Sequence, residues 1–208
     1  KTFHRKPLPA ECIVFSSQEG RTRFESALRN GGCEAYFHLA EQFTTQSDPS
    51  FCGVSSLVVI LNALSMDPGK TWNGSIWRWY HEEMLDGVCR DLDYVRKHGI
   101  TMAEFACIAR CHGCAVSLNY ATPLEETSET NIADFRAAVI KICCQRPEEE
   151  LNRKFLVCSY SRKALGQTGG GHFSPIAAYD AASDSVLILD VARYAWPRRH
   201  SHLAPFLL

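Results

Sequence analysis

The sequence predicts an α+β fold, with helices in the first half of the chain and a mostly antiparallel β-sheet in the second. Residues 53–64 carry apolar side chains at helical spacing and no charge, which indicates a buried helix. Thr101 and Glu104 form a capping-box pattern that opens a further helix. Beyond residue 153 the chain changes to short apolar runs separated by a glycine-rich loop and a turn, which is typical of antiparallel strands.

Cap residues and helix breakers delimit the other expected helices. Ser16 or Ser17 is a candidate N-cap for the first helix, and glycine or proline follows the ends of several others. Prolines at positions 7, 9 and 49 predict an extended N-terminal arm and a loop over residues 44–51. The expected helices span residues 19–29, 34–43, 53–64, 91–97, 101–110 and 131–144.

Apolar or alternating runs predict the strands. A turn over residues 180–184 joins the last two strands into a hairpin, and a glycine-rich loop over 161–171 precedes it. No internal repeat is visible, so we expect a single domain over residues 1–208. The expected strands span residues 115–119, 154–160, 174–179 and 186–190.

Charge and hydropathy exclude several classes of partner. The formal net charge is −1, so no basic excess predicts nucleic-acid binding. The longest apolar run, residues 57–61, is far shorter than the ~20 residues that span a bilayer. We therefore expect no membrane segment. The chain begins at Lys1 without methionine or an apolar leader, so we expect a trimmed chain in which no signal peptide is visible.

Ten cysteines are many for 208 residues. An oxidised, secreted framework is typical of small, core-poor chains, whereas 46% of this sequence is hydrophobic. We therefore expect reduced thiols and a cytoplasmic location. Cys107 and Cys111 are four residues apart on an expected helix and share one face. Together with Cys114 they do not match a standard zinc spacing, so core packing competes there with contact to a soft metal ion.

Three separated residues form the candidate catalytic group: Cys52, His172 and Asp190. Cys52 lies where a loop meets the apolar helix, and a helix N-terminus lowers the pKa of a thiol. A glycine-rich turn places His172 at the head of one hairpin strand, and Asp190 ends the next strand. Each residue alone is more typical of a structural position. Together they predict a thiol nucleophile, its base and the carboxylate that orients the base.

This order of a cysteine at a helix start with distant histidine and acid resembles papain-type cysteine enzymes. The same helix start offers amide donors to an oxyanion, and Gly53 permits close approach of the substrate. Gln46, on the incoming loop, occupies the place of the glutamine that completes the oxyanion site in papain-like enzymes.

Several longer motifs resemble the phytochelatin synthase family. They cover most of the chain in order, which makes the resemblance far more specific than a Cys–His pair. The matching segments are 41–47 (EQFTTQS), 51–53 (FCG), 61–64 (LNAL), 67–69 (DPG), 77–79 (WRW), 167–175 (QTGGGHFSP) and 189–194 (LDVARY).

The resemblance implies a papain-like fold and a transpeptidase. Family members cleave glycine from glutathione, hold a γ-Glu-Cys acyl group on the catalytic cysteine, and transfer it to a second glutathione or a phytochelatin. Their nucleophile, base, acid and oxyanion glutamine match Cys52, His172, Asp190 and Gln46. In the family a heavy-metal ion promotes the reaction. Cadmium is the expected ion and zinc or copper are alternatives, and the ion acts mostly as a metal–glutathione thiolate. No organic cofactor is implied, and a homodimer is left open.

The resemblance also suggests residues around the reacting group. Arg162 and Arg193 match basic family positions that suit the carboxylates of an acceptor, although either is compatible with an ordinary surface arginine. Gly53 and Gly171 are the expected close-approach positions for substrate. The family has cysteines at positions 107 and 111, which implies metal contact or a disulfide there.

Three departures and two alternatives qualify the resemblance. Phe51, Ala195 and a lone Cys89 stand where plant members often have Tyr, Lys and a cysteine pair. The variable Cys-rich C-terminal region of eukaryotic members is absent. The alternatives are a glutathione hydrolase or cysteine peptidase without transfer, and a non-catalytic protein that binds metal through its thiols.

Overall fold

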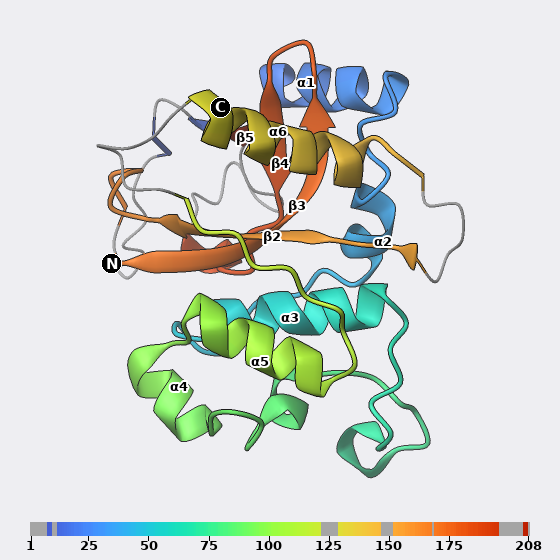
Figure 1. Ribbon diagram of the computed structural model, residues 1–208, viewed down its shortest axis with the longest axis vertical. Helices are drawn as coiled ribbons and strands as arrows, with labels where there is room; N and C mark the ends of the chain where they lie inside the picture. Colours follow the sequence, from blue (N-terminus) through green and yellow to red (C-terminus); the bar gives the residue numbers. More distant parts are fainter. Residues whose placement is uncertain are drawn as a thin grey trace.

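The computed structural model describes residues 8–9, 12–121, 129–146, 152–167, 169–195 and 206–207. The predicted α+β class is confirmed: α3, α4 and α5 form a helical layer, and a sheet with α1, α2 and α6 forms the rest of the molecule (Figure 1). In this two-part arrangement α3 lies between the sheet and the helices α4 and α5. The arrangement is consistent with a papain-like fold.

The sheet has five strands in the order β1-β5-β4-β3-β2, and every neighbouring pair is antiparallel. The expected hairpin is present as β3 and β4, and Tyr160 of β2 lies opposite His172 of β3. The two-residue strands β1 and β5 pair with each other at one side of the sheet and were not predicted. The strands are β1 (Cys12–Ile13), β2 (Leu156–Ser161), β3 (Gly171–Asp180), β4 (Ser185–Ile188) and β5 (Phe206–Leu207).

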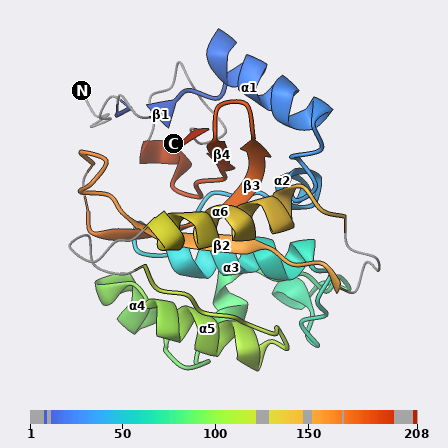
Figure 2. The ribbon, with the colours of Figure 1, turned by 45° about the horizontal axis from the view of Figure 1, so that its top comes forward.

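Strand β3 is the centre of the core because both of its faces are covered. Ile176 packs with Val139 of α6, whereas its neighbour Ala177 packs with Leu39 of α2 and Val59 of α3. Accordingly, α6 and α3 lie on opposite sides of the sheet (Figure 2). The burial of β3 on both faces explains its nearly continuous apolar sequence.

The expected helices are confirmed, with ends that differ by up to two residues. Ser17 accepts a hydrogen bond from the Gly20 N–H, and Thr101 and Glu104 form the predicted capping box. The α-helices are α1 (Gln18–Arg29), α2 (Tyr36–Glu41), α3 (Cys52–Ala63), α4 (Leu92–His98), α5 (Met102–Cys111) and α6 (Glu129–Cys143). The described 3₁₀ turns include η1 (Trp72–Gly74), η2 (Glu82–Leu85) and η5 (Arg193–Ala195).

The predicted strand over residues 115–119 is wrong. The segment is irregular, although Cys114 and Val116 pack against the core of the helical layer. Arg110 of α5 donates from Nη2 to the Val116 carbonyl at 3.1 Å. Alternating burial therefore arises from a coil lying on a helix, and the alternation does not require a partner strand.

Residues 1–7, 10 and 11 of the expected N-terminal arm lie outside the described residues. Across the described ranges, none of the helices has both the length and the apolar composition needed to traverse a lipid bilayer.

Gly32 joins α1 and α2 to the sheet, and a side chain should not be tolerated there. Its N–H donates to the Ala27 carbonyl, and its carbonyl accepts from the Tyr179 N–H. A Cβ added at Gly32 would lie 2.0 Å from the Tyr179 carbonyl oxygen. We expect Gly32→Ala to lower the free energy of unfolding by about 1–3 kcal/mol or more, measured by urea denaturation. Gly170→Ala is the control, because no atom lies within 4 Å of its added Cβ. Equal stability of both variants would contradict the packing described here.

Candidate active site

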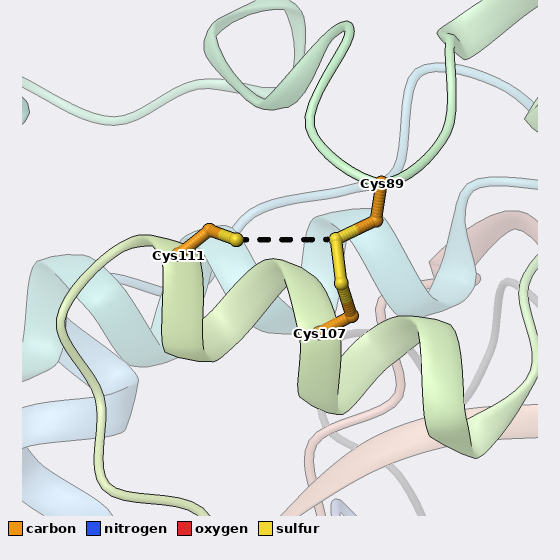
Figure 3. Close-up of side chains that lie close together, drawn as sticks. All are labelled: Cys89, Cys107 and Cys111. Carbon is orange, nitrogen blue, oxygen red and sulfur yellow. Dashed lines mark hydrogen bonds between the residues drawn. A yellow bond between two sulfur atoms is a disulfide. The ribbon is translucent and has the colours of Figure 1, made fainter.

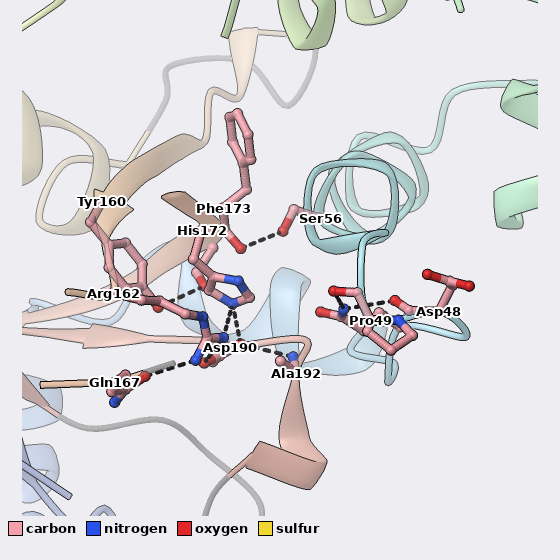
Figure 4. Close-up of polar contacts among 12 residues, drawn as sticks. Asp48, Pro49, Ser56, Tyr160, Arg162, Gln167, His172, Phe173, Asp190 and Ala192 are labelled. Atoms are coloured by element: carbon pink, nitrogen blue, oxygen red, sulfur yellow. Dashed lines mark hydrogen bonds and ion pairs between the residues drawn. The ribbon is translucent and has the colours of Figure 1, made fainter. Parts of the chain in front are cut away.

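The fold brings together the three residues that the sequence singles out. Cys52 is the first residue of α3, His172 is the second residue of β3, and Asp190 follows β4 by two residues. The hairpin places His172 and Asp190 side by side, as predicted, and α3 packs its start against β3. The imidazole ring and the carboxylate point toward one another near α3 (Figure 4).

Asp190 is the buried partner of the imidazole. Its Oδ1 lies 2.5 Å from His172 Nε2 and also accepts from the Ala192 N–H at 2.8 Å. Only 2% of the residue is exposed, so the carboxylate holds the ring in a fixed orientation. Because Asp190 engages Nε2, the nitrogen that remains for the Cys52 sulfur is Nδ1.

Arg162 is the third buried member of this network. Its Nη2 lies 3.4 Å from Asp190 Oδ2 and 2.8 Å from His172 Nε2, and its Nη1 donates to Gln167 Oε1 at 2.7 Å. A guanidinium only donates, so the Nε2 proton goes to Asp190 and the arginine pairs with the same carboxylate. Asp190 thus receives donors from three residues, which offsets the cost of burying its charge.

The Cys52 sulfur is half-buried and contacts donors of two kinds. Burial is the largest single influence and would raise the pKa of the Cys52 thiol. The hydrogen bond and charge of His172 and the backbone N–H groups of Phe173 and Gly53 together outweigh burial, so the pKa is lowered. By contrast, burial raises the pKa of Cys33 and Cys158 to about 12, so these thiols stay protonated.

The other two members shift in the directions that an ion pair requires. Burial opposes the charged imidazolium, but hydrogen bonds to Asp190 and Cys52 raise the pKa of His172. Burial likewise opposes a charged Asp190, but the hydrogen bond and charge of His172, the charge of Arg162 and the Ala192 N–H lower its pKa. The site therefore favours a thiolate, an imidazolium and a carboxylate in one row.

The start of α3 leaves backbone donors next to the sulfur. Phe51, at the N-cap, makes no side-chain cap bond, so no capping side chain covers the first-turn amides, and the Gly53 N–H contacts the Cys52 sulfur itself. The Gln46 N–H connects the loop before α3 to the segment after β4, because it donates to the Val191 carbonyl at 3.0 Å. These amides form a potential oxyanion site at the positive end of the helix dipole.

The Gln46 side chain has a local role that the sequence did not predict. Its Nε2 donates to the carbonyls of Asp48 at 2.8 Å and Pro49 at 2.9 Å, and its buried Oε1 has no hydrogen-bond partner. In this conformation the amide nitrogen shapes the loop before Cys52. Donation to an oxyanion requires one loop carbonyl to be released, so this role of Gln46 stays a prediction.

The remaining predicted contact residues lie around the site with different surroundings. An added Cβ at Gly53 would lie 2.5 Å from Ile100 Cδ1 and 3.2 Å from a Phe173 ring carbon, so packing already requires glycine there. Gly171 is exposed at the start of β3. The Arg193 guanidinium lies 5.5 Å from the centre of the Phe43 ring. Their contact with substrate stays a prediction.

The expectation that all cysteines are reduced is wrong for two of them. Cys89 and Cys107 form a disulfide, and Cys111 lies beside it with its sulfur 3.9 Å from that of Cys89. Cys89 has a backbone φ of 61°, which turns the chain between η2 and α4 toward α5. Sequence reasoning named Cys107 and Cys111 but could not place Cys89 over the same helix face.

Comparisons with known proteins identify the family of this chain. A family model described as phytochelatin synthase matches residues 3–204. The chain belongs to the phytochelatin synthase family. It is 41% identical over 197 residues to the glutathione gamma-glutamylcysteinyltransferase of Schizosaccharomyces pombe, covering 95% of this chain and 44% of the relative.

Two plant relatives show similar identity. The chain is 43% identical to glutathione gamma-glutamylcysteinyltransferase 3 of Lotus japonicus over 99% of this chain and 40% of the relative. It is also 43% identical to glutathione gamma-glutamylcysteinyltransferase 1 of Arabidopsis thaliana over 94% of this chain and 38% of the relative. The chain thus spans less than half the length of these phytochelatin synthase relatives.

The burial of Arg162 against His172 and Asp190 is the main feature of the site that the sequence analysis missed. Arg162 follows β2, and its N–H bonds to the Gly170 carbonyl at 2.8 Å. The register that pairs Tyr160 with His172 would have placed Arg162 near the histidine. That register depends on the loop length between the strands, which the sequence alone did not determine.

The lowered pKa of Cys52 predicts fast alkylation below the ordinary thiol range. We expect iodoacetamide to label Cys52 at a pH below its ordinary pKa of 9.0, with peptide mass spectrometry resolving the site. In His172→Ala the hydrogen bond and charge of the ring are lost, while burial and the Phe173 and Gly53 N–H groups remain, so the pKa of Cys52 should rise and labelling should shift to higher pH. The protonated Cys33 and Cys158 serve as internal controls. An unchanged Cys52 profile in His172→Ala would contradict the thiolate–imidazolium pair.

Proposed function

We propose that this chain catalyses the glutathione γ-glutamylcysteinyltransferase reaction, with Cys52, His172 and Asp190 as its catalytic residues. The observation that carries the proposal is the buried contact of one imidazole with a carboxylate on one side and a half-buried thiol on the other. Family membership supports the substrate class, and the printed names of the relatives support the transferred group.

The first half-reaction forms a thioester. The Cys52 thiolate attacks the carbonyl carbon of the Cys–Gly peptide bond, and the tetrahedral oxyanion is stabilised by the amides at the start of α3. His172, charged through its pair with Asp190, donates its Nδ1 proton to the glycine nitrogen as the C–N bond breaks. Glycine leaves, and the γ-Glu-Cys acyl group remains on the sulfur.

The second half-reaction transfers the acyl group. The amine of a second glutathione or a phytochelatin attacks the thioester carbonyl, neutral His172 takes the proton from that amine, and the C–S bond breaks to restore the Cys52 thiolate. Transfer competes with hydrolysis only if the acceptor amine is held close to the thioester. Positioning of this kind can lower the activation free energy by several kcal/mol, on the order of 7–11 at best. Arg193, Arg162, Gly53 and Gly171 are the proposed contacts with substrate, and Gln46 is the proposed second oxyanion donor.

The proposed acceptor is largely a metal–glutathione thiolate, so the heavy-metal ion enters as part of the substrate. Cadmium, zinc and copper are soft or borderline ions that bind thiolates well. The cytosol is the proposed compartment, and a homodimer is a proposal that the reaction itself does not require.

Incubating the chain with glutathione, with and without cadmium ion, tests the proposal. Oligomers of γ-Glu-Cys with free glycine, identified by mass spectrometry, are the expected products. Glycine and γ-Glu-Cys alone would mean a glutathione hydrolase. Metal binding without any glycine release would mean a non-catalytic thiol protein, and either result would contradict the transferase.

A further inference from the structure

A second group of sulfur atoms lies away from Cys52, on the outer face of α5. Cys89 and Cys107 form a disulfide, and all three sulfurs of Cys89, Cys107 and Cys111 lie within 4.8 Å of one another. Cys89 and Cys111 are exposed and Cys107 is half-buried, so solvent reaches the group. Figure 3 shows the Cys111 sulfur pointing at the disulfide from the next turn of the helix.

The segment that carries Cys89 is held in place by contacts that involve no sulfur. Arg90 forms an ion pair with Glu104 of α5, and Glu104 is itself fixed by the capping box at Thr101. On the other side, Asp86 Oδ1 accepts from the Leu92 N–H at 2.7 Å at the start of α4. Reduction of the disulfide therefore leaves the three sulfurs close together instead of releasing the segment.

We propose that this group alternates between two exclusive states: the Cys89–Cys107 disulfide, and a three-thiolate site for a thiophilic divalent metal ion. Two sulfurs on one tetrahedral zinc ion, each about 2.3 Å from it, lie about 3.8 Å apart. The sulfurs of Cys89 and Cys111 are 3.9 Å apart, which matches that spacing. A disulfide carries no thiolate charge, so the oxidised pair cannot bind the ion.

The local charge of α5 also suits a cation. Cys111 is the last residue of the helix, where the backbone carbonyls give the helix end a partial negative charge. A bound cation is favoured at such an end. Three protein sulfurs fill three positions of a tetrahedral ion and leave the fourth open to water or to a small thiol.

The exchange between the states balances with a thiol as reductant. One thiolate attacks a sulfur of the disulfide and releases the other cysteine as a thiolate, and a second thiolate then attacks the mixed disulfide. Two external thiols thus become one external disulfide, and the protein gains two thiols. Binding of the metal ion releases the protons of the three thiols. The assignment of glutathione as this thiol rests on the proposed function, whereas the metal site does not.

Cadmium binding to the full chain tests the two states directly. The Cys52→Ser variant serves as background, so that the nucleophile does not add a ligand. We expect reduction with a phosphine, which is not itself a thiol, to add one tightly bound cadmium ion per chain, seen as a sulfur-to-metal charge-transfer band. Cys111→Ser keeps the disulfide but should lose the added ion, and Cys89→Ser should lose both.

Cys114→Ser is the matched control, because Cys114 is a half-buried free cysteine just beyond α5 and outside the three-sulfur group. It should retain the added ion. Peptide mapping of the oxidised chain should find residues 89 and 107 joined. Equal cadmium binding before and after reduction, or full binding in Cys111→Ser, would overturn the proposal. Glycine release is measured separately with Cys52 present, so failure of the transferase and failure of the metal site give different results.

Discussion

Replacing Cys52 with serine should abolish glycine release from glutathione, with a loss on the order of 10⁴-fold or more. A serine hydroxyl stays protonated next to His172, whereas the contacts with the ring and the amides of Phe173 and Gly53 favour a thiolate. The α3 start is otherwise unchanged, so substrate binding should persist. The measurement is the initial rate of glycine formation at saturating glutathione.

The contrast with Cys114→Ser makes this test specific. Cys114 is also a half-buried free cysteine, but burial raises the pKa of its thiol. Its replacement should leave the rate within about twofold, because no element of the proposed mechanism involves it. Comparable rates for Cys52→Ser and the unchanged protein would exclude Cys52 as the nucleophile.

Replacing Asp190 with asparagine should lower kcat on the order of 10⁴-fold. Asp190 Oδ1 accepts from His172 Nε2 and from the Ala192 N–H, and Arg162 pairs with Oδ2, so an amide would place its NH2 group against one of these donors. It would also remove the negative charge that helps to raise the pKa of His172, so the imidazolium that pairs with the Cys52 thiolate would be disfavoured. KM for glutathione should change little, because Asp190 is buried and does not reach the substrate.

Asp180→Asn separates this effect from a loss of folding. Asp180 is equally buried at the end of β3 and accepts from Ser26 and Ser183. It lies at the other end of the strand from His172, so its replacement should lower stability and leave kcat unchanged. If Asp180→Asn reduced kcat as much as Asp190→Asn, with both variants folded, the proposed role of Asp190 in orienting and charging His172 would be wrong.

The elements of this fold that rest on local chemistry could be predicted from the sequence. The capping box at Thr101 defines the start of α5, and the charge-free run after Cys52 defines α3, because caps and apolar periodicity act over a few residues. The hairpin of β3 and β4 was predicted for the same reason. The predicted hairpin is sufficient to place His172 and Asp190 side by side.

Features that depend on tertiary register could not be predicted. Arg162 reaches Asp190 only because β2 and β3 pair Tyr160 with His172. Cys89 meets Cys107 only because a left-handed residue and the Arg90–Glu104 ion pair turn its segment onto α5. Each contact joins segments whose relative positions are determined by packing, and no local pattern in the sequence carries that information.

The acyl-enzyme provides the most direct test of the central proposal. The chain is mixed briefly with glutathione, quenched in acid and digested, and the peptide that contains residue 52 is weighed by mass spectrometry. The proposed mechanism predicts a γ-Glu-Cys group on Cys52, which is absent in Cys52→Ser and retained in Cys114→Ser. Glycine release with no acyl group on Cys52, or with the group on another cysteine, would contradict it.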